Sequence, residues 1–290
     1  MKDLKRKLKI VCLSLLLILG AVAACSLSLL KKKEGSIVIG AKNCTEQHIL
    51  SEICAQLIEK HTALNVVRRF HLQGTALCFQ ALLSEGIDFY LEYSGTALLD
   101  ILKQPLPDGN LFSYVAREMD EKYNLCFFAP LGFSNEYQLV GRRGEVTGAI
   151  SLLKEEKIGY DPEFSTRSER KLLERSYPIL SKKSSKLLDP SILYLALDSQ
   201  TLDVISVSST DGRLWSGKYI ALEDDRDCLP SYQVAPLVRK IVLEKYPELK
   251  SIFLKLEGKM TKAEMQRLNF EAEFEGKDIP TLCESFICGI

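Results

Sequence analysis

Short apolar segments that alternate with amphipathic helical segments are the feature that most constrains the fold. SIVIGAK (36–42) has the pattern of a buried strand, and TEQHILSEICAQLIEKH (45–61) places its apolar residues at helical spacing. A second strand and helix follow at 65–72 and 74–86, and a third strand at 87–93. Connections of this length join parallel strands through a covering helix, so the sequence predicts an α/β fold.

The same unit recurs later in the chain. ALLSEGIDFYLEYSGT (81–96) aligns without gaps with ALDSQTLDVISVSSTD (196–211), and five of the sixteen positions are identical. Each copy places polar residues where a strand ends, which is where ligands bind in open α/β sheets. We therefore predict two similar lobes whose strand tips face a shared cleft.

Two extended segments, 137–143 and 234–240, are the predicted crossovers between these lobes, and together they would form a hinge. Lobe I is predicted to comprise residues 36–138 and 239–290, and lobe II residues 139–238. The tail has a helical pattern and is expected to pack on lobe I.

The N-terminus has the pattern of an export signal. Basic residues precede an apolar run that is too short to span a bilayer, and the small residues Val-Ala-Ala follow, so residues 1–24 are the predicted signal peptide. The next residue, Cys25, resembles the acylated cysteine of the bacterial lipoprotein lipobox, and residues 25–35 then form a lipid anchor and tether. An uncleaved N-terminal anchor is the alternative. Both readings place the folded part in the periplasm or another extracytoplasmic space, held at the membrane.

The charge of the chain argues against a nucleic-acid-binding protein. Removing the predicted signal takes five basic residues and one acidic residue from totals of 38 and 38, leaving 33 against 37. A mildly acidic body without a basic stripe argues against nucleic acid as a partner.

Seven of the nine cysteines lie beyond Cys25, an odd number that cannot all pair within one chain. Most of them sit among apolar neighbours and are expected to be small core residues.

Motifs for catalysis or metal binding are absent from the sequence. There is no P-loop, GxSxG or HExxH motif, and Cys44 and His48 lack the tight spacing of a zinc site. The sequence therefore favours a binding protein without metal or cofactor over an enzyme.

Three tyrosines lie at or near the predicted junctions. Tyr93 ends a strand, Tyr137 stands at a crossover, and Tyr194 lies in a helix after Asp-Pro. Tyrosine faces attract cations, and aromatic cages hold quaternary ammonium groups, which have no proton to donate; each ring contributes roughly 0.5–2 kcal/mol. Taken alone, the three tyrosines are explained more simply by packing in the core.

Longer sequence motifs are more specific for a protein family than the three tyrosines are. Four segments resemble the solute-binding proteins of ABC importers for glycine betaine, choline and related osmoprotectants. They are IVIGAKNCTEQHIL (37–50), EYSGTALLDIL (92–102), LGFSNEYQLV (131–140) and LEDD with its sequel PSYQVAP (222–236). The likeness runs from about residue 36 to 287. It implies a two-lobed type II periplasmic-binding-protein fold with a hinge and an interlobe cleft, and separate ABC permease and ATPase subunits as partners.

The resemblance also implies a tyrosine cage at Tyr93, Tyr137 and Tyr194. A fourth cage tyrosine of the family falls on Ser208, which offers a hydroxyl where the other lobe offers a ring. The cage is then open on one side, weaker, or shaped for another head group. The family's phenylalanine in Asn-Phe-Thr-Glu falls on Cys44.

Polar residues complete the predicted ligand-binding site. Lys42 and Arg167 match positions that hold a ligand carboxylate in some family members, although each taken alone is equally an ordinary solvated side chain. An ammonium end over aromatic rings and a carboxylate end at Lys or a forked Arg define a zwitterion. Thr96 and Asn135 are the predicted hydrogen-bond donors in the cleft.

These implications predict a monomeric, lipid-anchored substrate-binding subunit of an ABC importer that captures a glycine betaine-like or choline-like solute. One alternative keeps the fold and changes the solute to another zwitterion, either amino-acid-like or a thione-bearing betaine. A second alternative is a sensory or adhesive surface lipoprotein that does not transport.

Overall fold

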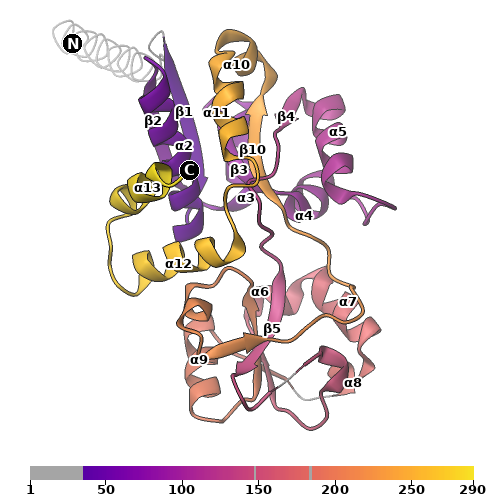
Figure 1. Ribbon diagram of the computed structural model, residues 1–290. Coiled ribbons are helices and arrows are strands. Elements are labelled where there is room, and N and C mark those ends of the chain that lie inside the picture. Colours follow the sequence, from indigo (N-terminus) through magenta and orange to yellow (C-terminus); the bar gives the residue numbers. More distant parts are fainter. Residues whose placement is uncertain (1–34, 147, 183–184) are drawn as a thin grey trace, which may run out of the picture.

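The computed structural model describes residues 35–146, 148–182 and 185–290, which form two lobes joined by two chain crossings (Figure 1). The predicted signal, the anchor cysteine Cys25 and the tether up to residue 34 lie outside the described residues. Among the helices that are described, none is both long and apolar enough to cross a membrane. Each lobe is built on a five-stranded sheet, so the predicted two-lobed α/β architecture is confirmed.

Lobe I is organised around a sheet with the strand order β2-β1-β3-β10-β4. Its strands are β1 (Ser36–Lys42), β2 (Asn65–Leu72), β3 (Phe89–Tyr93), β10 (Val234–Arg239) and β4 (Leu125–Phe127). β1 runs parallel to β2 and β3, whereas β10 runs antiparallel to β3 and β4. The expectation of parallel strands for the first three strands is confirmed. The sequence analysis assigned no direction to β10, which is antiparallel because the returning crossover enters the sheet from the opposite end.

Helices cover both faces of this sheet, and alternate residues of β1 enter different cores. Ile37 and Ile39 pack in one buried cluster, whereas Val38 packs in the other. Burial on both faces explains the unbroken apolar run of this strand.

The tail helices α11, α12 and α13 contact α2, so the expectation that the tail packs on lobe I is confirmed. The helical segments of the lobe are α2 (Thr45–His61), α3 (Gly74–Leu83), α4 (Ser94–Thr96), η1 (Ala97–Leu102), α5 (Leu111–Tyr123), α10 (Lys240–Lys245), α11 (Glu248–Leu256), α12 (Lys262–Glu273) and α13 (Ile279–Cys288).

Lobe II has a sheet with the order β7-β6-β8-β5-β9. Its strands are β7 (Ser185–Leu187), β6 (Ile158–Tyr160), β8 (Val204–Ser208), β5 (Tyr137–Arg142) and β9 (Tyr219–Ala221). β6 runs parallel to β7 and β8, and β5 runs antiparallel to β8 and β9. The helical segments around it are η2 (Ile150–Leu152), α6 (Pro162–Thr166), α7 (Ser168–Ser176), α8 (Pro178–Lys182), α9 (Pro190–Asp198) and η3 (Gly212–Ser216).

The two sheets have equivalent topologies. β3 and β8, the strands of the internal sequence match, are each central, with a parallel neighbour on one side and an antiparallel crossover strand on the other. The weak internal match therefore corresponds to a structural equivalence between the lobes. In each lobe the antiparallel neighbour is the strand through which the chain arrives from the other lobe.

The two crossing segments lie side by side at the hinge. Ser134 and Gln233 form an isolated antiparallel bridge, and the backbone N–H of Asn135 donates to the carbonyl of Tyr232 at 3.0 Å. The pairing of β10 in the first sheet puts the return to lobe I at Val234, so the boundary predicted at residue 238 falls inside that strand.

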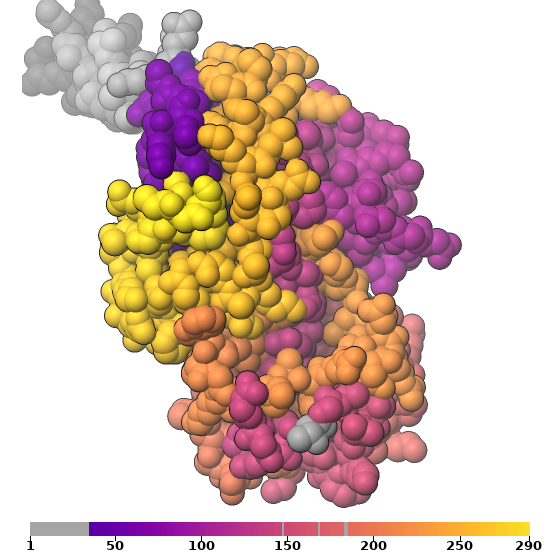
Figure 2. All heavy atoms as spheres, in the orientation of Figure 1, coloured from indigo at the N-terminus to yellow at the C-terminus, as the bar shows by residue number. Residues whose placement is uncertain are grey.

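Helix α12 forms a third contact between the lobes, which the sequence pattern did not indicate. Gln266 on α12 donates from Nε2 to the carbonyl of Ser209 at 2.7 Å, and Asn269 donates to the carbonyl of Thr210 at 2.9 Å. A Cβ on Gly212 would lie 2.6 Å from the backbone nitrogen of Phe270, so only glycine allows this approach of η3 to α12. Figure 2 shows the yellow tail region meeting the orange part of lobe II on this side.

Candidate ligand-binding site between the lobes

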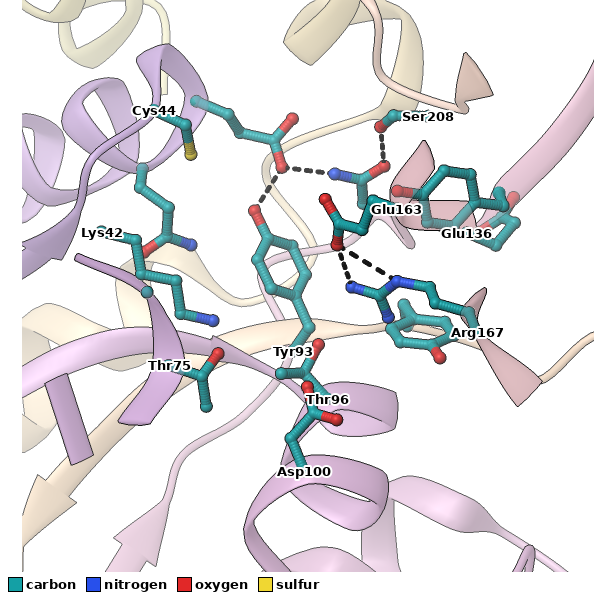
Figure 3. Close-up of a pocket in the computed structure, with 16 residues that line it drawn as sticks. Lys42, Cys44, Thr75, Tyr93, Thr96, Asp100, Glu136, Glu163, Arg167 and Ser208 are labelled. Atoms are coloured by element: carbon teal, nitrogen blue, oxygen red, sulfur yellow. Dashed lines mark hydrogen bonds and ion pairs between the residues drawn. The ribbon is translucent and has the colours of Figure 1, made fainter. Parts of the chain in front are cut away.

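A cavity of about 490 Å³ lies between the lobes, at the tips of the strands (Figure 3). A volume of this size is typical of sites for small molecules. The residues that line it come from both lobes and from the crossing segments: Lys42, Cys44, Glu46, Gln47, Gly74, Thr75, Tyr93, Thr96, Asp100, Asn135, Glu136, Tyr137, Glu163, Arg167, Ser208 and Tyr232.

The structure brings seven of the eight predicted ligand-binding residues to this cavity. These are Lys42, Tyr93, Thr96, Asn135, Tyr137, Arg167 and Ser208. The ends of β1 and β3 meet because the carboxyl ends of parallel strands share one edge of a sheet. The start of β5 reaches the same cavity because it follows the crossing segment from lobe I.

Tyr194 does not line the cavity, contrary to expectation. Its side chain is buried on α9 within a core of lobe II, where its ring meets the edge of Tyr219 at 5.0 Å. The guanidinium of Arg213 lies 4.5 Å from the centre of the Tyr194 ring. The phase of α9 turns this ring toward the sheet and away from the cavity.

The end of β3 is fixed by a buried carboxylate. Glu92 is fully buried and accepts hydrogen bonds from Lys42 Nζ at 2.5 Å, from the Tyr90 hydroxyl at 3.0 Å and from the backbone N–H of Tyr93 at 2.8 Å. The Lys42 ammonium lies 5.4 Å from the centre of the Tyr93 ring. A charge in the middle of an apolar strand is tolerated here because it is fully hydrogen-bonded.

The turn after β3 depends on Gly95. A Cβ at this position would lie 2.4 Å from the ring of Tyr232, which lines the cavity from the returning crossover. The Tyr232 hydroxyl donates to Glu169 of α7. Tyr232 therefore spans from the strand tip of lobe I to lobe II, a role that the sequence motif alone did not reveal.

Glu46 on the first turn of α2 is the central polar group of the cavity wall. It accepts hydrogen bonds from the Tyr93 hydroxyl, from Asn135 Nδ2 at 3.0 Å and from Asn269 Nδ2 at 3.1 Å. Burial raises the pKa of this carboxyl above its usual range, although the hydrogen bonds oppose the shift. Sequence reasoning missed Glu46. The available signal was an acidic residue in the first turn of a helix that directly follows a strand tip.

On the opposite wall, Arg167 lies against Tyr137. Its guanidinium carbon is 5.3 Å from the centre of the Tyr137 ring, and its nitrogens pair with Glu163 at 2.5 Å and with Glu169 at 3.3 Å. Glu169 is buried, whereas the Glu163 side chain is 66% exposed. The guanidinium that was predicted to hold a ligand carboxylate thus already contacts two carboxylates of the protein.

Ser208 connects lobe II to the crossing segment. Its hydroxyl donates to Asn135 Oδ1, and the amide nitrogen of Asn135 donates in turn to Glu46. Ser208 is also the strand partner of Tyr137, so a larger side chain at residue 208 would stand next to that ring. This chain of hydrogen bonds runs across the cavity from one lobe to the other.

The thiol of Cys44 lies at the cavity wall but is a poor nucleophile. Cys44 is exposed as a residue, but desolvation of the sulfur raises the pKa of its thiol to about 11, so the sulfur stays protonated at neutral pH. Within the described residues, no group of three or more His, Cys, Asp or Glu side chains is arranged to hold a metal ion.

Comparison with known families decides the class of protein. The family described as the substrate binding domain of ABC-type glycine betaine transport system matches residues 35–287. The chain belongs to this family. It is the substrate-binding component of an ABC-type importer, and the expectation that it is not an enzyme is confirmed by this membership.

Individual relatives agree with the family assignment. The chain is 30% identical over 280 residues to the carnitine transport binding protein OpuCC of Listeria monocytogenes, covering 92% of this chain and 91% of that one. It is 29% identical over 265 residues to the ergothioneine transport permease/ergothioneine binding protein EgtU of Helicobacter pylori, covering 88% of this chain and 48% of the relative. This ABC substrate-binding chain thus spans about half the length of the Helicobacter pylori protein.

Solved structures support the fold of this family member as well. The crystal structure of a glycine betaine/carnitine/choline ABC transporter matches with a TM-score of 0.81 at 25% identity, covering 87% of this chain and 98% of that one. The architecture is therefore that of type II periplasmic-binding proteins, as the sequence motifs implied. The family is extracytoplasmic, which agrees with the expected side of the membrane.

Proposed function

We propose that this chain captures a small quaternary-ammonium solute in the interlobe cavity and delivers it to an ABC permease driven by a separate ATPase. The proposed ligand-binding residues are Lys42, Tyr93, Thr96, Asn135, Tyr137, Arg167 and Ser208, with Glu46 and Tyr232 added from the structure. The observation that carries the proposal is the pair of rings, Tyr93 from lobe I and Tyr137 from lobe II, at one cavity in a member of the glycine betaine family.

Physical chemistry supports this ligand class. A trimethylammonium group is large, permanently charged and unable to donate a hydrogen bond, so aromatic faces and carboxylates are its best partners. The cavity offers both. Rings on opposite lobes would also favour closure, because the ligand contacts both of them only when the lobes approach each other.

Calorimetric titration tests the proposal. The chain, purified in mild detergent, is titrated with glycine betaine, carnitine, choline and proline betaine. We expect saturable binding of at least one of them at micromolar concentration, which needs about 8 kcal/mol, of which two or three ring contacts would contribute roughly 1–6 kcal/mol. Absence of heat for all four up to millimolar concentration would reject the proposal.

A second candidate keeps the fold and the cavity but changes the solute to a thione-bearing betaine. Two observations favour it: the similarity to the Helicobacter pylori ergothioneine binding protein and the serine at residue 208, which leaves room on one side of the cavity. Ergothioneine is therefore included in the same titration. Tighter binding of ergothioneine than of glycine betaine and choline would support this second candidate.

The membrane attachment is a separate part of the proposal. Cys25 follows Val-Ala-Ala and is the proposed site of lipid attachment, which would hold a monomeric receptor near its permease. Metabolic labelling with a radioactive fatty acid should label the wild-type chain and leave Cys25→Ser unlabelled. Labelling of the variant at the wild-type level would contradict the lipid anchor.

A further inference from the structure

The two cationic side chains of the cavity are already neutralised by carboxylates of the protein. Lys42 pairs at 2.5 Å with Glu92, which is fully buried and so has no solvent to stabilise it if Lys42 turns away. Arg167 pairs with Glu163 and with the buried Glu169. A ligand carboxylate would therefore have to compete with protein carboxylates at both positions.

The carboxylates of the cavity are not all neutralised in return. Glu136 pairs with Lys262 at 2.5 Å. Glu46 is buried and is held by the neutral donors Tyr93, Asn135 and Asn269. Asp100 on η1 is exposed at the cavity wall and forms no ion pair with the described residues.

The balance of charge at the cavity is consequently negative. Among the described residues, the charged side chains that line it, together with their ion-pair partners, are three cations and six carboxylates. The cations are Lys42, Arg167 and Lys262, and the carboxylates are Glu46, Glu92, Asp100, Glu136, Glu163 and Glu169. A cleft with low-dielectric walls focuses such a field, so it attracts a cation and repels an added carboxylate.

We infer that this cavity selects a quaternary-ammonium ligand of net positive charge over a zwitterion with the same head group. The inference rests on the proposed function and adds to it the net charge of the solute. Glu46 and Asp100 are the residues that determine this selectivity, because they are the two lining carboxyl groups that form no ion pair with the described residues. The hydroxyls of Thr75 and Thr96 on the same wall suit a ligand whose second end is a neutral hydroxyl or amide.

The test compares three ligands that share the trimethylammonium group. Glycine betaine ends in a carboxylate, its carboxamide has nearly the same shape without the negative charge, and choline ends in a hydroxyl. Each is titrated by calorimetry into the full chain in mild detergent. We expect the carboxamide and choline to bind at least about tenfold more tightly than glycine betaine. Glycine betaine binding as tightly as its carboxamide would overturn the inference while leaving the proposed function standing.

Two variants test whether Asp100 and Glu46 cause the preference for a cationic ligand over a zwitterion. Asp100→Asn, at an exposed position, should lower choline affinity severalfold and leave glycine betaine affinity unchanged or higher. Glu46→Gln should do the same. The matched control is Glu59→Gln, which makes the same change on helix α2 outside the cavity, where Glu59 pairs with Arg68. A ratio of choline to glycine betaine affinity that is the same in wild type and in Asp100→Asn would overturn the role of these carboxylates. Absence of heat for all three ligands would overturn both the inference and the proposed function.

Discussion

Glu46 shows how a single residue can cost stability and serve binding. Its carboxylate is buried, and the neutral side chains of Thr210, Tyr93, Asn135 and Asn269 hydrogen-bond it without neutralising its charge. A buried charge without a cationic partner is unfavourable, which is why burial raises the pKa of this group. A cationic ligand would supply the missing partner, so the unliganded protein carries a cost that binding relieves.

The first prediction follows for Glu46→Gln in the absence of ligand. The pKa of Glu46 is higher in the folded state than its usual value of 4.5, so the folded state binds this proton more tightly than the unfolded chain. The contribution of Glu46 to stability is therefore fully present below about pH 4.5 and is lost as the pH rises through the raised pKa. At neutral pH, Glu46→Gln should therefore increase the free energy of unfolding, because the neutral amide removes the cost of ionising a buried carboxyl group.

Urea unfolding at several pH values checks this prediction. The gain in stability of Glu46→Gln over wild type should shrink as the pH falls toward 4.5. Glu59→Gln, on the same helix but partly exposed, should show no such trend. A variant that is less stable than wild type at neutral pH would show that the hydrogen bonds of the carboxylate outweigh the cost of burying it.

Ser208 carries the second prediction. A ring at this position would stand beside Tyr137, its partner across the β5–β8 pair, and would add a face to the cavity. Ser208→Tyr should tighten binding of choline by roughly 0.5–2 kcal/mol. Ser208→Leu loses the same hydroxyl bond to Asn135 without adding a ring, and it serves as the control. Equal choline affinity in the two variants would contradict the cage interpretation.

At the scale of elements, the junction of β3 and α4 positions the cavity wall. Gly95 lies against the ring of Tyr232, so even the methyl group of alanine would overlap it. The third prediction is that Gly95→Ala lowers the free energy of unfolding by about 1–3 kcal/mol, because the Tyr232 ring or the turn must shift. Denaturant unfolding measures the change. Gly289→Ala, where the added methyl meets only ordinary contacts at 3.4 Å, is the control, and an equal loss in both variants would contradict the packing argument.

Elements and strand tips could be read from the sequence because local patterns encode them. The predicted first strand and helix coincide with β1 (Ser36–Lys42) and α2 (Thr45–His61), where burial follows the apolar residues. The sequence analysis made no prediction of the direction of β5 and β10, because an extended segment has the same residue pattern in a parallel and in an antiparallel pair. The carboxylates were missed for a different reason: what surrounds Glu46 is decided by Asn135 and Asn269, which are distant in sequence.

At the scale of the whole molecule, three connections set the angle between the lobes. Two are the crossing segments, which pair with each other at Ser134 and Gln233. The third is the contact of η3 with α12, where Gly212 meets the backbone of Phe270. Closure around a ligand must either preserve this third contact as a pivot or slide along it.

The last prediction tests that contact with Gly212→Val. A side chain at Gly212 would overlap backbone atoms of α12 at 2.6–2.9 Å, and backbone cannot move aside as a flexible side chain can. The variant should hold lobe II away from α12, giving a larger radius of gyration by small-angle scattering and at least about tenfold weaker choline binding, since misplacing one wall loses the contacts that span the cavity. Trp215 in the same segment is 46% exposed and provides a fluorescence signal for the displacement. Ser216→Ala, an exposed position of η3, is the control. If Gly212→Val kept the wild-type radius of gyration and affinity, η3 would have to move over α12 freely, and closure would depend on the two crossing segments alone.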